Sequence, residues 1–99
     1  MPERKSVKKS SELKLPPQDL ESERSVLGAL LLDKNAVIQV ADSIAPSDFY
    51  ETKNQRVYEA VLELFSKGEP IDILTVSHIL KEKKELASIG GVEYLTELV

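Results

Sequence analysis

Apolar residues recur in this sequence with the period of an α-helix, and no stretch of useful length alternates with the period of a β-strand. A half-buried strand alternates apolar and polar side chains, so the absence of alternation argues against a sheet. The gaps between the helical stretches are also too short to hold a strand. The pattern predicts an all-α fold in which six helical pieces form a compact, non-parallel bundle.

Capping residues and helix breakers set the expected boundaries. Asp19 is placed to cap the first helix, Pro46 stops the second, and Thr52 with Gln55 has the spacing of a capping box. Gly68 suits a left-handed stop, and Asp72 is placed to cap the helix that follows. The expected pieces are 20–32, 34 or 35 to 44, a turn at 47–50 capped by Ser47, 52–67, 72–82, a turn at 88–91, and a last helix from Val92.

The helix from Thr52 is the most apolar of the chain, because its apolar residues cover more than half of its circumference. We therefore expect it to be central and largely surrounded. The helix from Asp72 has a narrow apolar stripe, with His78 on the opposite, solvent-facing side. This helix should lie at the periphery.

Two residues do not fit the leucine stripe of the first helix. Glu23 projects between Leu27 and Leu30, where a carboxylate has to find a partner or reach solvent. We interpret Glu23 as structural, in a salt bridge or cap contact with a residue such as Lys53 or Arg56; the alternative is a contact at an interface. Gly28 costs a helix about 1 kcal/mol relative to alanine, so we expect it to admit the backbone of another helix.

The last helix carries apolar residues on two sides, with Val92, Leu95 and Val99 on one and Tyr94 and Leu98 on the other. Two apolar stripes on a terminal helix suggest a missing partner, which is a following segment or another subunit. We therefore expect the chain to be a fragment, and we take Tyr94, Leu98 and Val99 as the candidate exposed contact surface.

Charge is divided unevenly along the chain. Residues 1–15 hold five Lys and Arg against two Glu, whereas residues 16–99 hold eight Lys and Arg against fifteen Asp and Glu. We interpret the first segment as a disordered basic tail and the second as one folded domain. The acidic domain would repel phosphates, which disfavours a nucleic-acid-binding function for it.

Few residues offer chemistry. The four glycines match no phosphate-binding loop, the one histidine lies on a solvent-facing side, and there is no pair of acid and base or of nucleophile and base. We therefore expect no catalytic residue, no cofactor and no metal site. With no cysteine, no signal peptide and no apolar run of roughly 20 residues, the chain is interpreted as cytoplasmic, with no membrane partner.

Three segments resemble a known family in order and spacing. These are PPQDLESERSVLGALLLD, then SDFYETKNQRVYEAVLELFSKGEPIDILTVSHILKE, then LASIGGVEYLTEL. Together they closely resemble the N-terminal domain of the bacterial replicative DNA helicase of the DnaB type, over residues 16–99. The resemblance implies a six-helix all-α domain, in agreement with the periodicity.

The resemblance also implies a function in DNA replication. Members of this family are hexameric helicases that use ATP and Mg2+, and they contact DNA through a later domain that this sequence lacks. Their N-terminal domains pair through a following helical hairpin, form a collar on the ring, and meet primase and helicase loaders. A chain that ends at Val99 would lack the hairpin and should be a monomer or weak dimer. The alternative is the helicase-binding domain of a bacterial primase, which has a similar helical fold.

Overall fold

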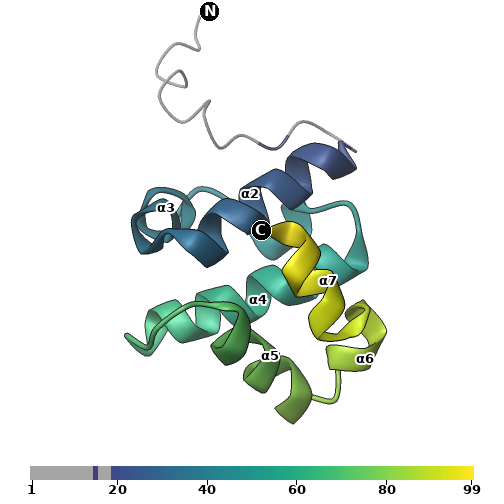
Figure 1. Cartoon of the computed structure of the whole chain (residues 1–99). Coiled ribbons are helices and arrows are strands. Elements are labelled where there is room, and N and C mark those ends of the chain that lie inside the picture. The colour runs from purple at the N-terminus through teal and green to yellow at the C-terminus, as the bar shows by residue number, and fades with distance from the viewer. Residues whose placement is uncertain (1–14, 16–18) are drawn as a thin grey trace, which may run out of the picture.

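The computed structural model describes Leu15 and residues 19–99, and this part of the chain contains α-helices and no strand. The expected all-α, six-helix fold is confirmed (Figure 1). The helices are α2 (Leu20–Leu32), α3 (Lys34–Val40), α4 (Thr52–Ser66), α5 (Ile73–Glu82), α6 (Leu86–Ile89) and α7 (Gly91–Leu98), with a 3-10 turn, η2, at Pro46–Asp48. The predicted basic tail lies outside the described residues, apart from Leu15.

Helix α4 lies at the centre of the bundle, as its wide apolar surface predicts. It contacts α2, α3, η2, α5 and α6, and Figure 1 shows it crossing the middle of the molecule between α2 and α5. Its residues Val57, Tyr58, Ala60 and Val61 have no exposed surface. Burial of each large apolar side chain contributes about 1.5–3 kcal/mol, so the residues around α4 supply much of the folding free energy.

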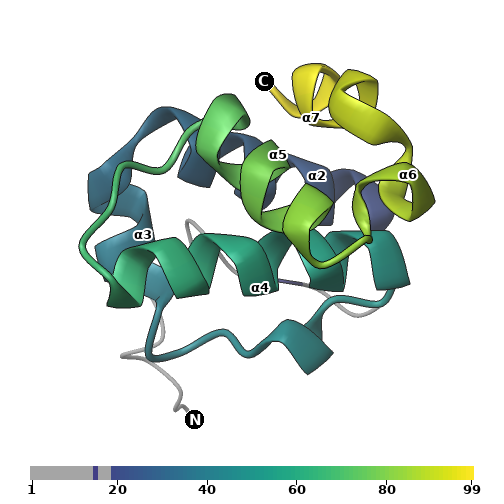
Figure 2. The same cartoon turned by 90° about the horizontal axis from the view of Figure 1, so that it is seen from below.

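Helix α7 returns to α2, the first helix of the described residues. After the single turn of α6, Gly90 adopts a φ of 107°, which favours glycine, and lets α7 start in a new direction. In Figure 1, α7 runs from α6 back toward α2, so the C-terminal end lies beside α2. Figure 2 shows α6 and α7 grouped at one end of the molecule, near the start of α4.

The stop of α4 and the cap of α5 agree with the prediction. Gly68 adopts a φ of 68° directly after the C-cap of α4. Asp72 and Thr75 form a reciprocal capping box, because the Asp72 side chain accepts from the Thr75 N–H at 2.8 Å and the Thr75 hydroxyl accepts from the Asp72 N–H at 3.0 Å. These signals are local in the sequence, and the local structure follows them.

Three other boundaries differ from the prediction. Helix α3 ends at Val40 rather than near residue 44, and residues 41–43 form a turn. Beyond this turn, the Tyr58 hydroxyl donates to the Ile44 carbonyl at 2.6 Å. The following turn begins at Pro46, which suits a first helical position, and Ser47 is not its cap. Leu86–Ile89 forms a helical turn where part of a loop was expected, and it buries Ile89.

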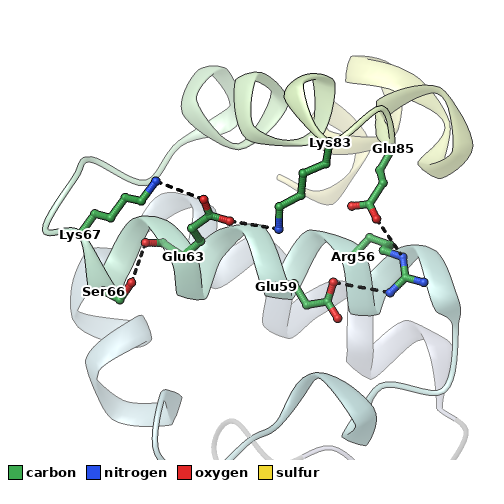
Figure 3. A network of polar contacts seen from close by, with 7 residues as sticks. All are labelled: Arg56, Glu59, Glu63, Ser66, Lys67, Lys83 and Glu85. Carbon is green, nitrogen blue, oxygen red and sulfur yellow. Dashed lines mark hydrogen bonds and ion pairs between the residues drawn. The ribbon is translucent and has the colours of Figure 1, made fainter.

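Ion pairs fasten the connection between α5 and α6 onto α4 (Figure 3). The Glu63 carboxylate is 3.0 Å from Lys83 Nζ and 3.1 Å from Lys67 Nζ, and Arg56 Nε is 3.5 Å from a Glu85 oxygen. The hydrogen bond from Lys83, followed by that from Lys67, lowers the pKa of Glu63. Because the folded pKa is lowered, this stabilisation is present above the ordinary pKa of 4.5 and is lost as the pH falls through the lower folded value.

Candidate functional site

The Glu23 carboxylate is the most unusual feature of the interior, because only 1% of the residue is exposed. It projects from α2 toward the chain that leads into α4. One oxygen accepts from the Tyr50 N–H at 2.5 Å, and the other accepts from Asn54 Nδ2 at 2.9 Å and more weakly from the Glu51 N–H at 3.4 Å. A buried carboxylate needs such donors to offset its lost hydration.

A third helix joins this group through Asn54, which has no exposed surface. The Tyr94 hydroxyl of α7 donates to Asn54 Oδ1, while the Asn54 amide donates to Glu23. Burial, reinforced by the nearby Glu51 carboxylate, raises the pKa of Tyr94 to about 12, so its hydroxyl stays protonated at neutral pH. We call Glu23, Asn54 and Tyr94 the polar relay, since each belongs to a different helix of α2, α4 and α7.

The predicted partners of Glu23 are wrong. Lys53 instead places its ammonium 4.2 Å from the centre of the Tyr94 ring, and Arg56 pairs with Glu59 and Glu85. Backbone N–H groups and an amide take the place of a cation, because the segment before α4 passes directly over the Glu23 side chain.

The predicted capping box at Thr52 is also wrong. Thr52 is the first residue of α4 and is exposed, and the N-cap is Glu51, whose side chain makes no capping hydrogen bond. Gln55 turns back instead and donates to the Phe49 carbonyl at 2.8 Å. A residue of another helix stabilises the start of α4, because Glu23 of α2 accepts hydrogen bonds from the N–H groups of Tyr50 and Glu51. A carboxylate near a helix N-terminus is also favoured by the helix dipole.

Gly28 lies where α7 meets α2. A Cβ at this position would overlap the carbonyl oxygen of Leu98 and lie 3.1 Å from its carbonyl carbon. Gly28 therefore allows the backbone of another helix to approach α2, as the low helix propensity of glycine led us to expect. The approaching helix is α7.

The predicted contact surface of Tyr94, Leu98 and Val99 is largely buried within the domain. Tyr94 and Leu98 pack into the core against α2 and α4, so the expectation that they are exposed is wrong. Two other apolar residues of this region are exposed: Val99 is 48% exposed and Val92 is 45% exposed. The two-sided pattern arises because α7 packs against α2, α5 and α6 at once.

The histidine and the buried carboxylate both make contacts within the chain. In the described part of the chain, no three His, Cys, Asp or Glu side chains are grouped so as to hold a metal ion. His78 is exposed and pairs with Glu82 at 3.2 Å on the same helix. Glu23 accepts from three donors of its own chain. No helix in residues 19–99 is long and apolar enough to cross a membrane.

Asn54 and the buried role of Tyr94 are not predicted by the sequence pattern. A signal existed for Asn54, since an amide on the apolar side of a central helix needs a buried partner. Nothing local links Asn54 to Glu23, which lies 31 positions earlier, or to Tyr94, which lies 40 positions later. These contacts depend on how α2, α4 and α7 pack.

Comparison of the sequence with known proteins identifies a family that the chain matches. Residues 15–99 match the model of the DnaB-like helicase N terminal domain. The chain is 41% identical over 85 residues to the replicative DNA helicase DnaB of Geobacillus stearothermophilus, which covers 86% of this chain and 19% of that protein. It is 47% identical over 83 residues to the replicative DNA helicase DnaB of Leifsonia xyli, which covers 84% of this chain and 18% of that protein.

A solved structure agrees with the sequence matches. The N-terminal domain of DnaB helicase from Mycobacterium tuberculosis superposes with a TM-score of 0.81 at 47% identity, covering 84% of this chain and 59% of that one. The chain spans less than a fifth of the length of the curated relatives named above.

Replacing Glu23 tests the buried carboxylate. We expect Glu23→Gln to lower the free energy of unfolding by about 2–3 kcal/mol, because an amide NH2 group would face the donors that the carboxylate accepts. Urea denaturation measures the change. The matched control is Glu21→Gln, an exposed acid in the same helical turn, which should cost less than about 1 kcal/mol. Equal losses in the two variants would contradict the assignment.

Replacing Gly28 tests the close approach of α7. We expect Gly28→Ala to destabilise the domain by roughly 1–3 kcal/mol, because the clash with the Leu98 backbone outweighs the better helix propensity of alanine. Ser25→Ala, on the exposed side of α2, should be neutral or slightly stabilising. A Gly28→Ala variant that melts at a higher temperature than the parent would show that α7 does not require the glycine.

Proposed function

Because the chain belongs to the family of DnaB-like helicase N-terminal domains, we propose that it is the scaffold domain of a replicative DNA helicase. In this role it contributes to assembly of the hexameric ring and docks primase or a helicase loader during DNA replication. The observation that carries the proposal is 47% identity with a solved DnaB N-terminal domain over 84% of this chain.

The polar interior supports a structural rather than a catalytic role for this domain. Glu23, Asn54 and Tyr94 satisfy one another and the backbone, so the buried acid within residues 19–99, Glu23, is already paired. We propose that ATP and Mg2+ bind to other parts of the longer helicase, and that DNA is contacted there as well. The acidic character of residues 16–99 fits such a division of labour.

The same family supports a cytoplasmic location, where bacterial chromosomes are replicated. It also favours a helicase over the helicase-binding domain of a primase, because the curated relatives named above are replicative helicases. The docking surface should use exposed apolar side chains rather than Tyr94 and Leu98. Exposed large apolar residues of the described chain are Leu32, Ile38, Tyr50, Leu74, Val92 and Val99.

Sedimentation velocity tests the docking role. We expect the chain alone to sediment as a monomer or weak dimer, and to sediment faster when mixed with the helicase-binding domain of primase from the same organism. The primase catalytic domain, at the same concentration, is the matched control and should cause no change. If the folded chain sediments identically in both mixtures, primase docking by this domain is contradicted.

A further inference from the structure

Helix α7 and the segment Phe49–Glu51 lie far apart in the sequence, but both are linked to Glu23. The carboxylate accepts directly from the Tyr50 and Glu51 N–H groups, and it is linked to Tyr94 of α7 through Asn54. We propose that the polar relay couples them, so that displacement of α7 loosens Phe49–Glu51 and displacement of this segment loosens α7. The proposal does not depend on which partner the domain binds.

The first step is the fixed orientation of the Asn54 amide. Its oxygen faces the Tyr94 hydroxyl and its nitrogen faces Glu23. A flipped amide would place its oxygen against the carboxylate and its NH2 group against the hydroxyl, which is a donor there. The hydroxyl and the carboxylate therefore hold the amide from both sides. Loss of the hydroxyl leaves a buried carbonyl oxygen unpaired, so the amide is then held from the Glu23 side alone.

The second step is the dependence of Phe49–Glu51 on Glu23. This segment lies between η2 and α4, outside regular structure, and its Tyr50 side chain is 62% exposed. The Phe49 ring anchors one end by packing against the Tyr58 ring at a centroid distance of 5.0 Å. The Tyr50 N–H has Glu23 as its acceptor, so a carboxylate that shifts releases the exposed end of the segment.

The third step is the modest intrinsic stability of α7. It has eight residues and neither end has a side-chain cap, so it forms because it is docked rather than because of its own propensity. Its docking to α2 and α4 uses the Gly28 contact, the Tyr94 hydroxyl and Lys53 over the Tyr94 ring. The coupling concerns the difference between α7 docked in this way and α7 displaced from its contacts.

Coupling of this kind is reciprocal, because a ligand that favours one arrangement of one site shifts the other by the same free energy. Tyr50 is a large exposed side chain at one end of the relay, and α7 is at the other. Binding of a partner to Tyr50 would therefore change the stability of α7 docking, and displacement of α7 would change the mobility of Phe49–Glu51. The domain thus couples the conformations of these two segments.

Amide hydrogen exchange measured by NMR on this chain tests the coupling. In Tyr94→Phe, we expect the Tyr50 amide to exchange roughly fivefold faster than in the parent, after correction for the change in global stability. The matched control is Tyr58→Phe, which also removes a buried hydroxyl contacting the domain core, but one that donates to the Ile44 carbonyl. In this control, exchange at Tyr50 should change only as global stability does.

A second variant acts on α7 without touching the relay. Gly28→Ala pushes on the Leu98 backbone at the far end of α7, and coupling predicts faster exchange at Tyr50 in this variant too. Unchanged corrected exchange at Tyr50 in both Tyr94→Phe and Gly28→Ala would overturn the proposal. So would equal corrected changes in Tyr94→Phe and Tyr58→Phe.

Discussion

A carboxylate buried at 1% exposure is stable only where donors surround it, and this requirement fixes the centre of the domain. Glu23 meets its donors only when the segment before α4 crosses α2 and when Asn54 faces inward. Alternative packings of the same helices would leave it unpaired, so the carboxylate favours one arrangement over others. The aliphatic core supplies most of the stability, and the polar relay fixes the position of α2, α4 and α7 relative to one another.

Local signals in the sequence predicted local structure well. The all-α class, the central position of α4, the Gly68 stop and the Asp72 cap each depend on residues within a few positions of one another. The close helix approach at Gly28 was predictable because a glycine inside a leucine-rich helix needs a reason. The identity of the approaching helix was not, since it is decided by packing.

The predictions that are wrong concern contacts between residues that lie far apart in the sequence. Thr52 has the spacing of a capping box, but Glu23 holds the N–H groups before α4, so the box is not formed. The two apolar sides of α7 predict exposed side chains at Tyr94 and Leu98, whereas α7 packs against several helices at once and buries both. The charge of Lys53 predicts an ion pair with Glu23, but its ammonium lies over the Tyr94 ring. In each case a tertiary contact outweighed a local preference.

Glu23 and Tyr94 are linked through Asn54, so their contributions to stability should not be independent. A double-mutant cycle of Glu23→Gln and Tyr94→Phe, measured by urea denaturation, tests this link. We expect a coupling energy of about 0.5–2 kcal/mol, and a value below ~0.5 kcal/mol for the parallel cycle of Glu23→Gln with Tyr58→Phe. Additive losses in the first cycle would contradict it, because they would mean that the carboxylate and the hydroxyl stabilise the domain independently.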